Sequence, residues 1–334
     1  MIVSWNTTNE CNMYCDHCYR ESGPLAPREL TTGEARDMIE GIAAAGFRIM
    51  IFSGGECLMR SDLEELVAHA SALGLRPVLG TNGSLLTRER AQALKDAGCL
   101  AAGISLDSLE AAKHDALRKY DGAFEEALAG MRACREVGLP YQIHTTVMDW
   151  NRAEVPEMAD FAVAQGARAF HVFFLVPVGR AAAIEESSLR AAEYEQLIDK
   201  LMEKAETVPI EIKPTCAPQF MRIALRRGMR PRFSKGCLAG TSYCIIGPSG
   251  SVQPCAYMNI SAGNVRERPF DKIWRDSPMF KRLRTEDYAG RCGSCEYSKR
   301  CGGCRARALY YHGDFMAEEP WCLYKPPQEE ASVG

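Results

Sequence analysis

Three cysteines stand close together near the start of the chain, in the stretch TNECNMYCDHCYRES of residues 8–22. Cys11, Cys15 and Cys18 are an odd number of thiols, whereas disulfides need an even number and a closed zinc site needs four ligands. Three thiolates can hold three irons of a [4Fe-4S] cluster and leave the fourth iron for another ligand. The spacing therefore indicates a metal site that is open on one side.

A second group of eight cysteines lies between residues 237 and 322. Its members are Cys237, Cys244, Cys255, Cys292, Cys295, Cys301, Cys304 and Cys322. The two CxxC pairs in this group would by themselves indicate zinc, but eight thiols also fit two clusters of four ligands each. The other four cysteines, Cys57, Cys99, Cys134 and Cys216, are scattered, and scattered cysteines are usually small buried side chains.

Composition and charge limit the class of protein. The chain has 334 residues, of which 46% are hydrophobic and 25% charged, as in ordinary globular proteins. A net charge of -3 gives no general attraction to nucleic acid or to an anionic membrane. No apolar run is long enough to span a membrane, and the N-terminus lacks the features of a signal peptide. We therefore expect a cytoplasmic protein without nucleic-acid or membrane partners, whose clustered cysteines serve metal sites rather than disulfides.

Helical and apolar stretches alternate from residue 33 to about residue 177. Five amphipathic stretches each end at a glycine and are followed by a short apolar run; these glycines are Gly46, Gly74, Gly98, Gly138 and Gly166. Glycine suits these positions because it readily adopts the left-handed conformation that closes a helix. With residues 2–8 as a first strand, the pattern predicts six parallel strands connected by helices.

Two segments allow a more detailed prediction. In residues 61–74, Ser61 and Glu64 match a capping box at the start of a helix. The apolar side chains of that helix share one face and are Leu63, Leu66, Val67, Ala70 and Leu73. Residues 244–255, CIIGPSGSVQPC, predict two short strands joined by a turn.

Unusual polar and glycine-rich motifs follow each predicted strand. The three-cysteine loop follows the first strand, and the later strands end at Gly54-Gly55-Glu56, Thr81-Asn82-Gly83, Ser105-Leu106-Asp107, residues 144–147 and residues 175–180. In parallel barrels the active site is built from the loops at the carboxyl ends of the strands. The sequence therefore predicts an α/β fold, a partial six-stranded (β/α) barrel of the TIM type, followed by a cysteine-rich C-terminal domain.

Taken together, these motifs resemble the radical S-adenosylmethionine (SAM) superfamily, and the second cysteine group resembles its SPASM iron-sulfur extension. The resemblance implies that SAM chelates the open iron at Cys11, Cys15 and Cys18 and is cleaved reductively to a 5'-deoxyadenosyl radical. It also implies one or two auxiliary [4Fe-4S] clusters. Their expected ligand sets are Cys237, Cys244, Cys255 and Cys304, and Cys292, Cys295, Cys301 and Cys322. The number of such clusters varies among SPASM proteins, which leaves open that Cys244 binds no iron.

The same resemblance suggests which residues contact SAM. Gly54 and Gly55 would allow close backbone approach, and Glu56 would balance the SAM ammonium. Tyr19 and Leu175 would flank the adenine, and the polar residues Asn82, Ser105 and Thr145 would contact the ribose or the carboxylate. Most members have proline after the GGE motif, whereas this chain has Cys57.

The resemblance also suggests domains and a substrate. The expected parts are a barrel at 1–185, a helical bridge at 186–236, a SPASM domain at 237–325 and a tail at 326–334. The opening WNTTNECNMYCDHCYRESG, the stretch FFLVPVGRA and the closing PWCLYKP are similar to tetrapyrrole-modifying enzymes of the AhbC and NirJ types, which act in haem synthesis from sirohaem.

An AhbC-like enzyme would convert 12,18-didecarboxysirohaem to Fe-coproporphyrin III, with electrons from a reductant such as flavodoxin or ferredoxin. Arg180 is then a candidate contact for a substrate carboxylate, because its planar guanidinium can bind a carboxylate with two hydrogen bonds. Two alternatives stay open. A SPASM enzyme that modifies a peptide, in peptide or sulfatase maturation, would share these motifs. An iron-sulfur electron carrier would keep the cysteines without needing Glu56 or the polar strand ends.

Overall fold

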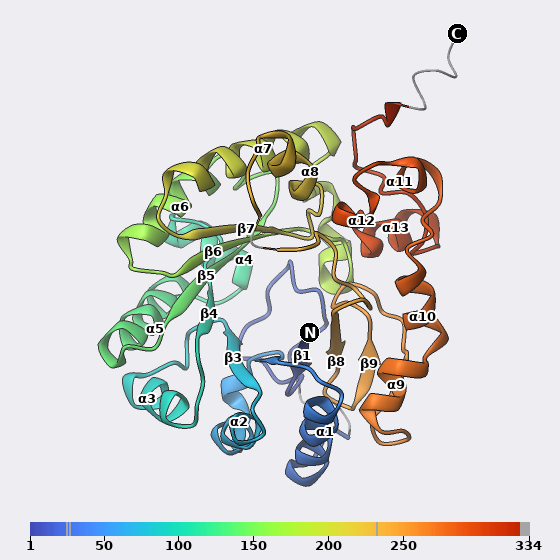
Figure 1. The fold of residues 1–334 in the computed structure, drawn as a ribbon. Coiled ribbons are helices and arrows are strands. Elements are labelled where there is room, and N and C mark those ends of the chain that lie inside the picture. The colour runs from blue at the N-terminus through green and yellow to red at the C-terminus, as the bar shows by residue number, and fades with distance from the viewer. Residues whose placement is uncertain (25, 27, 232, 328–334) are drawn as a thin grey trace.

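The computed structural model describes residues 1–24, 26, 28–231 and 233–327, and Figure 1 shows one curved sheet with helices around it. The ten strands of the sheet follow the order β10-β9-β8-β1-β2-β3-β4-β5-β6-β7. Strands β1 to β7 are parallel to their neighbours and lie in chain order. Their bounds are β1 Ile2–Asn6, β2 Ile49–Ser53, β3 Arg76–Thr81, β4 Ala102–Ser105, β5 Tyr141–Val147, β6 Ala169–Phe174 and β7 Glu211–Thr215.

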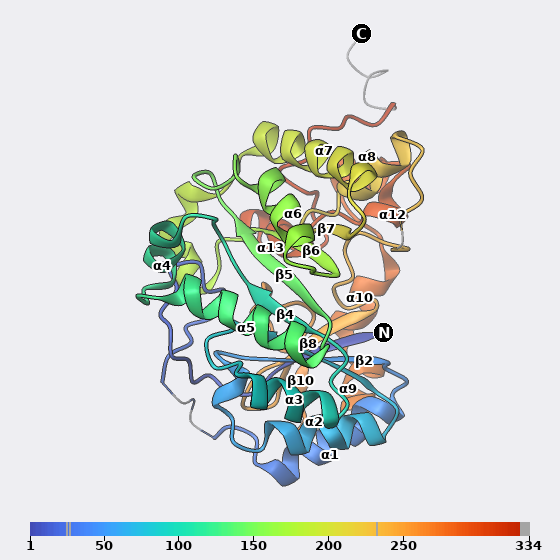
Figure 2. The ribbon, with the colours of Figure 1, turned by 90° about the vertical axis from the view of Figure 1, so that its left-hand side faces the viewer.

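Helices cover the convex side of this sheet, as Figure 2 shows for α3, α5 and α6. The helices of this part are α1 Thr32–Ala44, α2 Leu63–Ala72, α3 Arg88–Asp96, α4 Ala111–Arg118, α5 Ala123–Val137, α6 Val155–Ala164, α7 Ala191–Thr207 and α8 Phe220–Arg226, with short 3-10 turns η1 Cys57–Met59 and η2 Gly179–Ser187. The predicted alternation and partial barrel are confirmed. All five predicted helix-closing glycines have left-handed φ angles, between 67° and 96°.

Three local expectations were wrong. The sheet continues into β7, inside the segment predicted as a helical bridge, because the sequence EIKPT has no apolar run to signal a strand. Helix α2 begins after Asp62 without a side-chain cap, since Glu64 pairs with Arg90 instead of closing a capping box with Ser61. Leu73, predicted to lie on the buried face of α2, is 40% exposed.

The C-terminal part extends the barrel sheet instead of forming a separate one. Strand β8 (Tyr243–Ile246) pairs in parallel with β1, and β9 (Ser251–Gln253) returns antiparallel to β8, which confirms the predicted hairpin. Strand β10 (Gly263–Asn264) completes the edge. The helices of this part, at the right of Figure 1, are α9 Phe270–Asp276, α10 Pro278–Thr285, α11 Gly290–Ser294, α12 Ser298–Cys301 and α13 Arg305–His312. Most of the predicted tail lies outside the described residues.

Side chains alternate between the helix-covered face of the sheet and the interior of the barrel. In β5, Tyr141, Ile143, Thr145 and Val147 are buried, whereas the intervening residues keep part of their surface accessible. Among those intervening residues, His144 stacks on His171 of β6. The interior face of β5 therefore carries polar side chains, and the outer face belongs to the core.

Candidate active site

The three-cysteine loop connects β1 to α1 and folds back on itself. Cys11 N donates to Gly23 O at 3.0 Å, and Gly23 N donates to Asn9 O at 3.0 Å. Burial, with smaller effects from Glu56 and from the neighbouring thiols of Cys15 and Cys18, raises the pKa of the Cys11 thiol to about 12. The structure thus brings the three predicted ligands together, and iron binding would have to replace the thiol protons.

Two glycines at the end of β2 let this loop pack directly against the sheet. Gly55 N donates to Thr8 O at 2.8 Å. A side-chain carbon on Gly54 would lie 2.7 Å from Thr8 O, and one on Gly55 would lie 2.3 Å from Glu10 O. Both positions therefore exclude any larger residue. The close approach in this structure is to the cysteine loop, and the predicted approach to SAM stays a prediction.

Glu56 is fully buried and ties β2 to the end of β3. Its carboxylate accepts hydrogen bonds from Thr81 Oγ1 at 2.7 Å, Asn82 N at 2.8 Å and Leu58 N at 3.1 Å. Burial raises the pKa of Glu56, while these hydrogen bonds act in the opposite direction. Cys57 is also fully buried, and its thiol contacts Gly80 O at 3.3 Å, so it behaves as a core residue.

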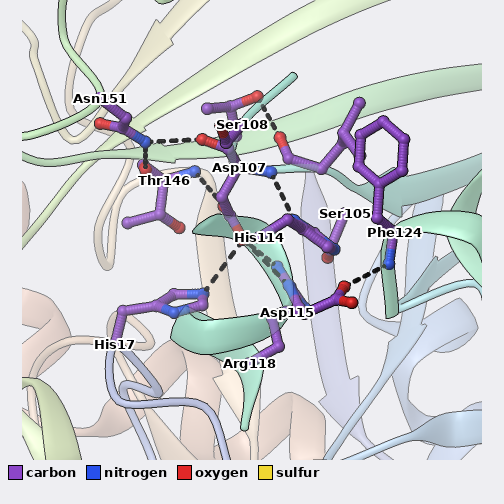
Figure 3. Close-up of polar contacts among 12 residues, drawn as sticks. His17, Ser105, Asp107, Ser108, His114, Asp115, Arg118, Phe124, Thr146 and Asn151 are labelled. Carbon is purple, nitrogen blue, oxygen red and sulfur yellow. Dashed lines mark hydrogen bonds and ion pairs between the residues drawn. The ribbon is translucent and has the colours of Figure 1, made fainter. Parts of the chain in front are cut away.

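A second buried carboxylate, Asp107, follows β4 and accepts several donors (Figure 3). Arg118 donates to Asp107 Oδ2 from Nη2 at 2.6 Å and from Nε at 2.9 Å, and Thr146 N donates to Oδ1 at 2.8 Å. His17 of the cysteine loop and His114 of α4 each place a ring nitrogen 3.8 Å from Oδ2. Burial would raise the pKa of Asp107, but Arg118 and the two histidines hold it well below its usual value.

The same network fixes the cysteine loop to the end of α4. Tyr14 N donates to Arg118 O at 3.3 Å, and Asp16 N donates to Leu117 O at 3.0 Å. Lys119, which follows with a left-handed φ of 52°, pairs with Asp16 at 2.9 Å. Sequence reasoning noted Asp107 only as the end of a strand motif and did not identify Arg118, because nothing in the spacing of the two residues indicates a pair.

Arg180 also braces this loop. Its Nε donates to Cys15 O at 2.9 Å, its Nη1 donates to Ser22 O at 2.5 Å, and its guanidinium lies 3.9 Å from the ring centre of Tyr14. Two of its nitrogens are therefore occupied by the loop backbone. The geometry supports a role in ordering the loop more directly than the predicted contact with a substrate carboxylate.

The polar residues predicted to contact SAM fall into two groups. Asn82 is bound to the cysteine loop, because its Nδ2 donates to Asn12 Oδ1 at 2.9 Å. Ser105 Oγ donates to Thr81 O at 3.3 Å from the interior face of β4. Thr145, by contrast, faces away from the barrel interior: its hydroxyl donates to Leu106 O at 2.6 Å, beside Met158 of α6. The expected SAM contact of Thr145 is therefore wrong, because strand alternation turns its side chain to the helices.

The two residues predicted to flank adenine also differ. Tyr19 donates to Asn6 Oδ1 at 2.8 Å, and its ring centre lies 5.4 Å from that of Tyr257. Leu175 is 4% exposed and packs with Leu117, Met148 and Ala181 in a small apolar cluster. Tyr19 therefore borders the barrel interior, whereas the Leu175 side chain is covered by protein and the structure does not support its contact with adenine.

The interior of the barrel carries a polar layer, of which only Ser105 was predicted from the sequence to contact SAM. Ser105, His144, His171 and Lys213 are register partners on the adjacent strands β4 to β7. The rings of His144 and His171 are stacked with centres 5.1 Å apart. Burial lowers the pKa of both histidines, so both are neutral at pH 7. Lys213 was missed because it lies in β7, which the sequence did not reveal.

One predicted auxiliary ligand set lines a single cavity. The walls of this cavity include Cys292, Cys295, Cys301 and Cys322. Glu319 N donates to Cys292 Sγ at 3.3 Å. Within the described part of the chain, no three Cys, His, Asp or Glu side chains already stand around a metal position. The donor set and the cavity nonetheless fit one four-thiolate cluster.

The other predicted set is only partly assembled. Cys237, Cys255 and Cys304 are electrostatic neighbours of one another. Cys244 is fully buried on the opposite face of β8, in register with Val3 of β1 and near Arg284 of α10. The expected role of Cys244 as a ligand is therefore contradicted by the alternation of β8, which directs this side chain into the hydrophobic core.

Comparison with known proteins places these sites in a family. A family model described as the radical SAM superfamily matches residues 5–162, and one described as an iron-sulfur cluster-binding domain, SPASM, matches residues 237–304. A protein named AdoMet-dependent heme synthase, from Nitratidesulfovibrio vulgaris, is 42% identical over 339 residues, covering 97% of this chain and 92% of the relative. The chain belongs to the radical SAM superfamily. Within the superfamily it belongs to the branch that carries a SPASM domain.

Two further comparisons concern another relative and a solved structure. A Methanosarcina barkeri protein named Fe-coproporphyrin III synthase is 30% identical, covering 96% of this chain and 87% of the relative. The structure of native anSMEcpe with bound AdoMet superposes with a TM-score of 0.75 at 15% identity, covering 96% of this chain and 93% of that one. The second comparison shows a shared fold. None of the described helices is both long and apolar enough to cross a membrane.

Membership in this family fixes the cofactors. The protein is an enzyme that uses SAM with a [4Fe-4S] cluster, and its SPASM domain carries auxiliary iron-sulfur clusters. The cluster supplies the electron that cleaves SAM. Hydrogen bonds hold the cysteine loop against β2, β3 and α4, and Arg118 and Arg180 lie beside it. Burial raises the pKa of the Cys15 thiol, and these two arginines act in the opposite direction.

Proposed function

We propose that this enzyme modifies the side chains of an iron tetrapyrrole in haem synthesis. The similarity to a protein named AdoMet-dependent heme synthase, which spans 97% of this chain, carries the proposal. The similarity to a protein named Fe-coproporphyrin III synthase supports the same substrate class. A peptide-modifying function is less well supported, because the peptide-bound structures share the fold at only 15–17% identity.

Among tetrapyrrole reactions, we favour the one that forms haem. Identity is 42% to the haem synthase and 30% to the Fe-coproporphyrin III synthase. Haem carries vinyl groups where Fe-coproporphyrin III carries two of its propionates. Each conversion would release carbon dioxide, pass one hydrogen atom to the 5'-deoxyadenosyl radical and return one electron to the iron-sulfur clusters, which balances the electron used to cleave SAM. Conversion of 12,18-didecarboxysirohaem to Fe-coproporphyrin III is the second candidate, supported by the relative of that name.

The polar layer inside the barrel suits such a substrate. Lys213 points inward from β7, where its ammonium lies 4.0 Å from the ring centre of Phe233. Burial lowers the pKa of the half-buried Lys213, and the nearby Glu211 acts in the opposite direction. A substrate carboxylate would stabilise its ammonium further, and tetrapyrroles carry several carboxylates at the edge of an apolar ring. His144 and His171 are neutral imidazoles, the form that binds haem-type iron. We propose Lys213, in place of Arg180, as the contact for a substrate carboxylate.

The source of electrons and the location follow from the cofactors. Reduction of the cluster requires a low-potential donor, and a protein such as flavodoxin or ferredoxin would meet this need. A chain with fifteen cysteines, most of them proposed iron ligands, suits a reducing compartment, which supports a cytoplasmic location.

A turnover experiment tests the proposed function. Anaerobically reconstituted enzyme, SAM and a reductant are incubated in parallel with Fe-coproporphyrin III, with 12,18-didecarboxysirohaem and with a cysteine-containing peptide. We expect mass spectrometry to detect haem from the first substrate together with 5'-deoxyadenosine. Fe-coproporphyrin III formed from the second substrate alone would favour the deacetylation reaction. A modified peptide without any change of either tetrapyrrole would reject the proposal.

A binding experiment tests the role of Lys213. Visible spectra of the tetrapyrrole are recorded during titration with the wild-type protein, with Lys213→Met and with Lys200→Met, whose lysine is exposed on α7. Loss of a charge-assisted contact worth about 1.5–3 kcal/mol should weaken binding about tenfold or more in Lys213→Met. Lys200→Met should bind like the wild type. Equal affinity of the two variants would show that Lys213 does not contact the substrate.

A further inference from the structure

Cys216 stands where β7 ends and has an unusual backbone conformation. Its φ angle is 59°, in the left-handed region that residues other than glycine seldom adopt. Such a conformation persists only where the surrounding structure holds it, and it is often found at functional sites. Sequence reasoning classed Cys216 with the scattered cysteines, because twenty residues separate it from Cys237.

A chain of buried hydrogen bonds joins the backbone of Cys216 to that of Cys304. Tyr194 Oη shares its hydrogen between Gln219 Oε1 at 2.7 Å and Cys216 O at 3.3 Å, and it accepts from Arg307 Nη2 at 2.7 Å. Arg307 Nε donates to Glu319 Oε1 at 2.9 Å, and Glu319 Oε2 accepts from Cys304 N at 2.6 Å. The ion pair of Arg307 and Glu319 is fully buried, so it holds the two cysteine segments in a fixed relation.

Close backbone packing brings Cys237 to the same place. A side-chain carbon on Gly236 would lie 2.7 Å from Pro218 O, two residues after Cys216, and 2.8 Å from Cys301 O. Cys237 N donates to Cys301 O at 3.0 Å, so the segment on both sides of Cys237 is fixed. The absence of a side chain at Gly236 therefore lets the segments that carry Cys216 and Cys237 touch.

The four thiols Cys216, Cys237, Cys255 and Cys304 form a mutually interacting group. Each of the six pairs among them repels electrostatically when ionised, and after the larger effect of burial this repulsion raises the thiol pKa values of Cys216, Cys255 and Cys304. Cys244 takes no part in this group, since the charged neighbour that acts on its thiol is Arg284. Four adjacent cysteine thiolates are the ligand set that holds a [4Fe-4S] cluster.

We propose that Cys216, and not Cys244, is the fourth ligand of the auxiliary cluster held by Cys237, Cys255 and Cys304. Each thiol gives up its proton when it binds iron. The proposal rests on the auxiliary clusters of the SPASM family and not on the identity of the substrate, so a failed turnover experiment would leave it intact. The structure assigns Cys244 to the hydrophobic core.

Iron analysis of matched variants tests the ligand set. The background is a full-length protein with Cys11, Cys15 and Cys18 changed to alanine, so that only auxiliary clusters contribute. Into it we introduce Cys216→Ala or Cys244→Ala and measure iron and acid-labile sulfide per chain after anaerobic reconstitution, together with electron paramagnetic resonance spectra after reduction. We expect Cys216→Ala to lose or alter one cluster signal, with up to half of the auxiliary iron lost, and Cys244→Ala to match its parent. Full iron and an unchanged spectrum in Cys216→Ala, or an equal loss in both variants, would overturn the proposal.

Alkylation of the wild-type holoenzyme gives a second test that does not depend on the folding of a variant. Native protein is treated with iodoacetamide before and after removal of iron by a chelator, and the labelled cysteines are identified by mass spectrometry. Cys216 should be protected in the holoenzyme and become labelled after iron removal, together with Cys237 and Cys255. Labelling of Cys216 in the intact holoenzyme would show that its thiol is not bound to iron.

Discussion

The carboxylate of Asp107 is ionised although it is buried away from water. Its side chain is fully buried, and the cations and imidazoles around it come from the cysteine loop and from α4. His114 Nδ1 accepts a hydrogen bond from Asp107 N at 3.1 Å, so this ring is neutral and carries its proton on Nε2. Arg118 is therefore the main counter-charge of Asp107 beneath the loop that holds the first cluster.

Asp107→Asn should destabilise the protein strongly, because it leaves Arg118 buried without its counter-charge. We expect a loss of about 3–5 kcal/mol in the free energy of unfolding at pH 7, measured with urea on the reconstituted protein. The folded-state pKa of Asp107 lies below its unfolded value of about 3.9, so its contribution is present above that pH and is lost as the pH falls toward the folded-state pKa. The variant should lack this acid-dependent loss.

The exposed Asp121, also close to α4, provides the control for this prediction. Asp121→Asn should change the free energy of unfolding by no more than about 0.5 kcal/mol. If Asp107→Asn were as stable as this control, the charge of Asp107 would have no structural role.

At the scale of single residues, the sequence predicted which residues belong to the sites better than it predicted which way their side chains point. The cysteine loop and the GGE motif were identified from spacing, because three thiols and two glycines have few other uses together. Thr145 and Cys244 were assigned wrongly, since neighbouring residues on a strand face opposite sides and spacing does not reveal which side is inside. Cys216 was overlooked for a related reason: only the fold brings it near Cys304.

The three-cysteine loop, as an element, is held by backbone contacts with the end of β2. Besides the bond from Gly55 to Thr8, Glu56 N donates to Glu10 O at 2.8 Å, so the loop continues the hydrogen bonding of the sheet. Helix and strand order were predictable because glycines and apolar runs mark them. The packing of the loop against β2 was not predictable, because it depends on backbone hydrogen bonds to carbonyl groups that every residue has.

Gly55→Ala should displace the loop, since the new carbon would lie 2.3 Å from Glu10 O and neither backbone can yield easily. A shift of about 1 Å in reacting groups can cost about 100-fold in rate. We expect SAM cleavage, followed as 5'-deoxyadenosine, to fall by that order, with auxiliary-cluster iron retained. Gly33→Ala in α1 is the matched control, because nothing lies within 4 Å of its new carbon. If Gly55→Ala cleaved SAM at the wild-type rate, the loop would not depend on close packing at Gly55.

Across the whole molecule, the SPASM part and the barrel share one sheet. Strand β8 pairs with β1 over four residues, and Tyr243 Oη donates to Ser4 Oγ at 3.0 Å. On the outside, Arg266 pairs with Glu34 at the start of α1 at 2.7 Å. The two parts are therefore not separable units, although the cysteine pattern divides the sequence clearly into two groups.

A fragment of residues 1–236 should consequently fail to form a stable monomer. Removal of β8 leaves the backbone of β1 unpaired at a parallel edge and uncovers the buried side chain of Val3. Size-exclusion chromatography and circular dichroism should show aggregation or loss of structure, while the full chain elutes as a folded protein. A monodisperse fragment with native helix content would show that the barrel folds by itself.

The pairing of β1 with β8 also imposes a delay during synthesis. Ser4 and its hydrogen-bond partner Tyr243 are 239 positions apart in the chain. At about 5–20 residues per second, the ribosome needs roughly 10–50 s to make the strand that covers β1 after β1 itself has been made. During that interval one edge of the nascent sheet has no partner. The cell must therefore protect the first strand of this enzyme, by chaperones or by delayed collapse of the chain, until nearly three quarters of the protein exists.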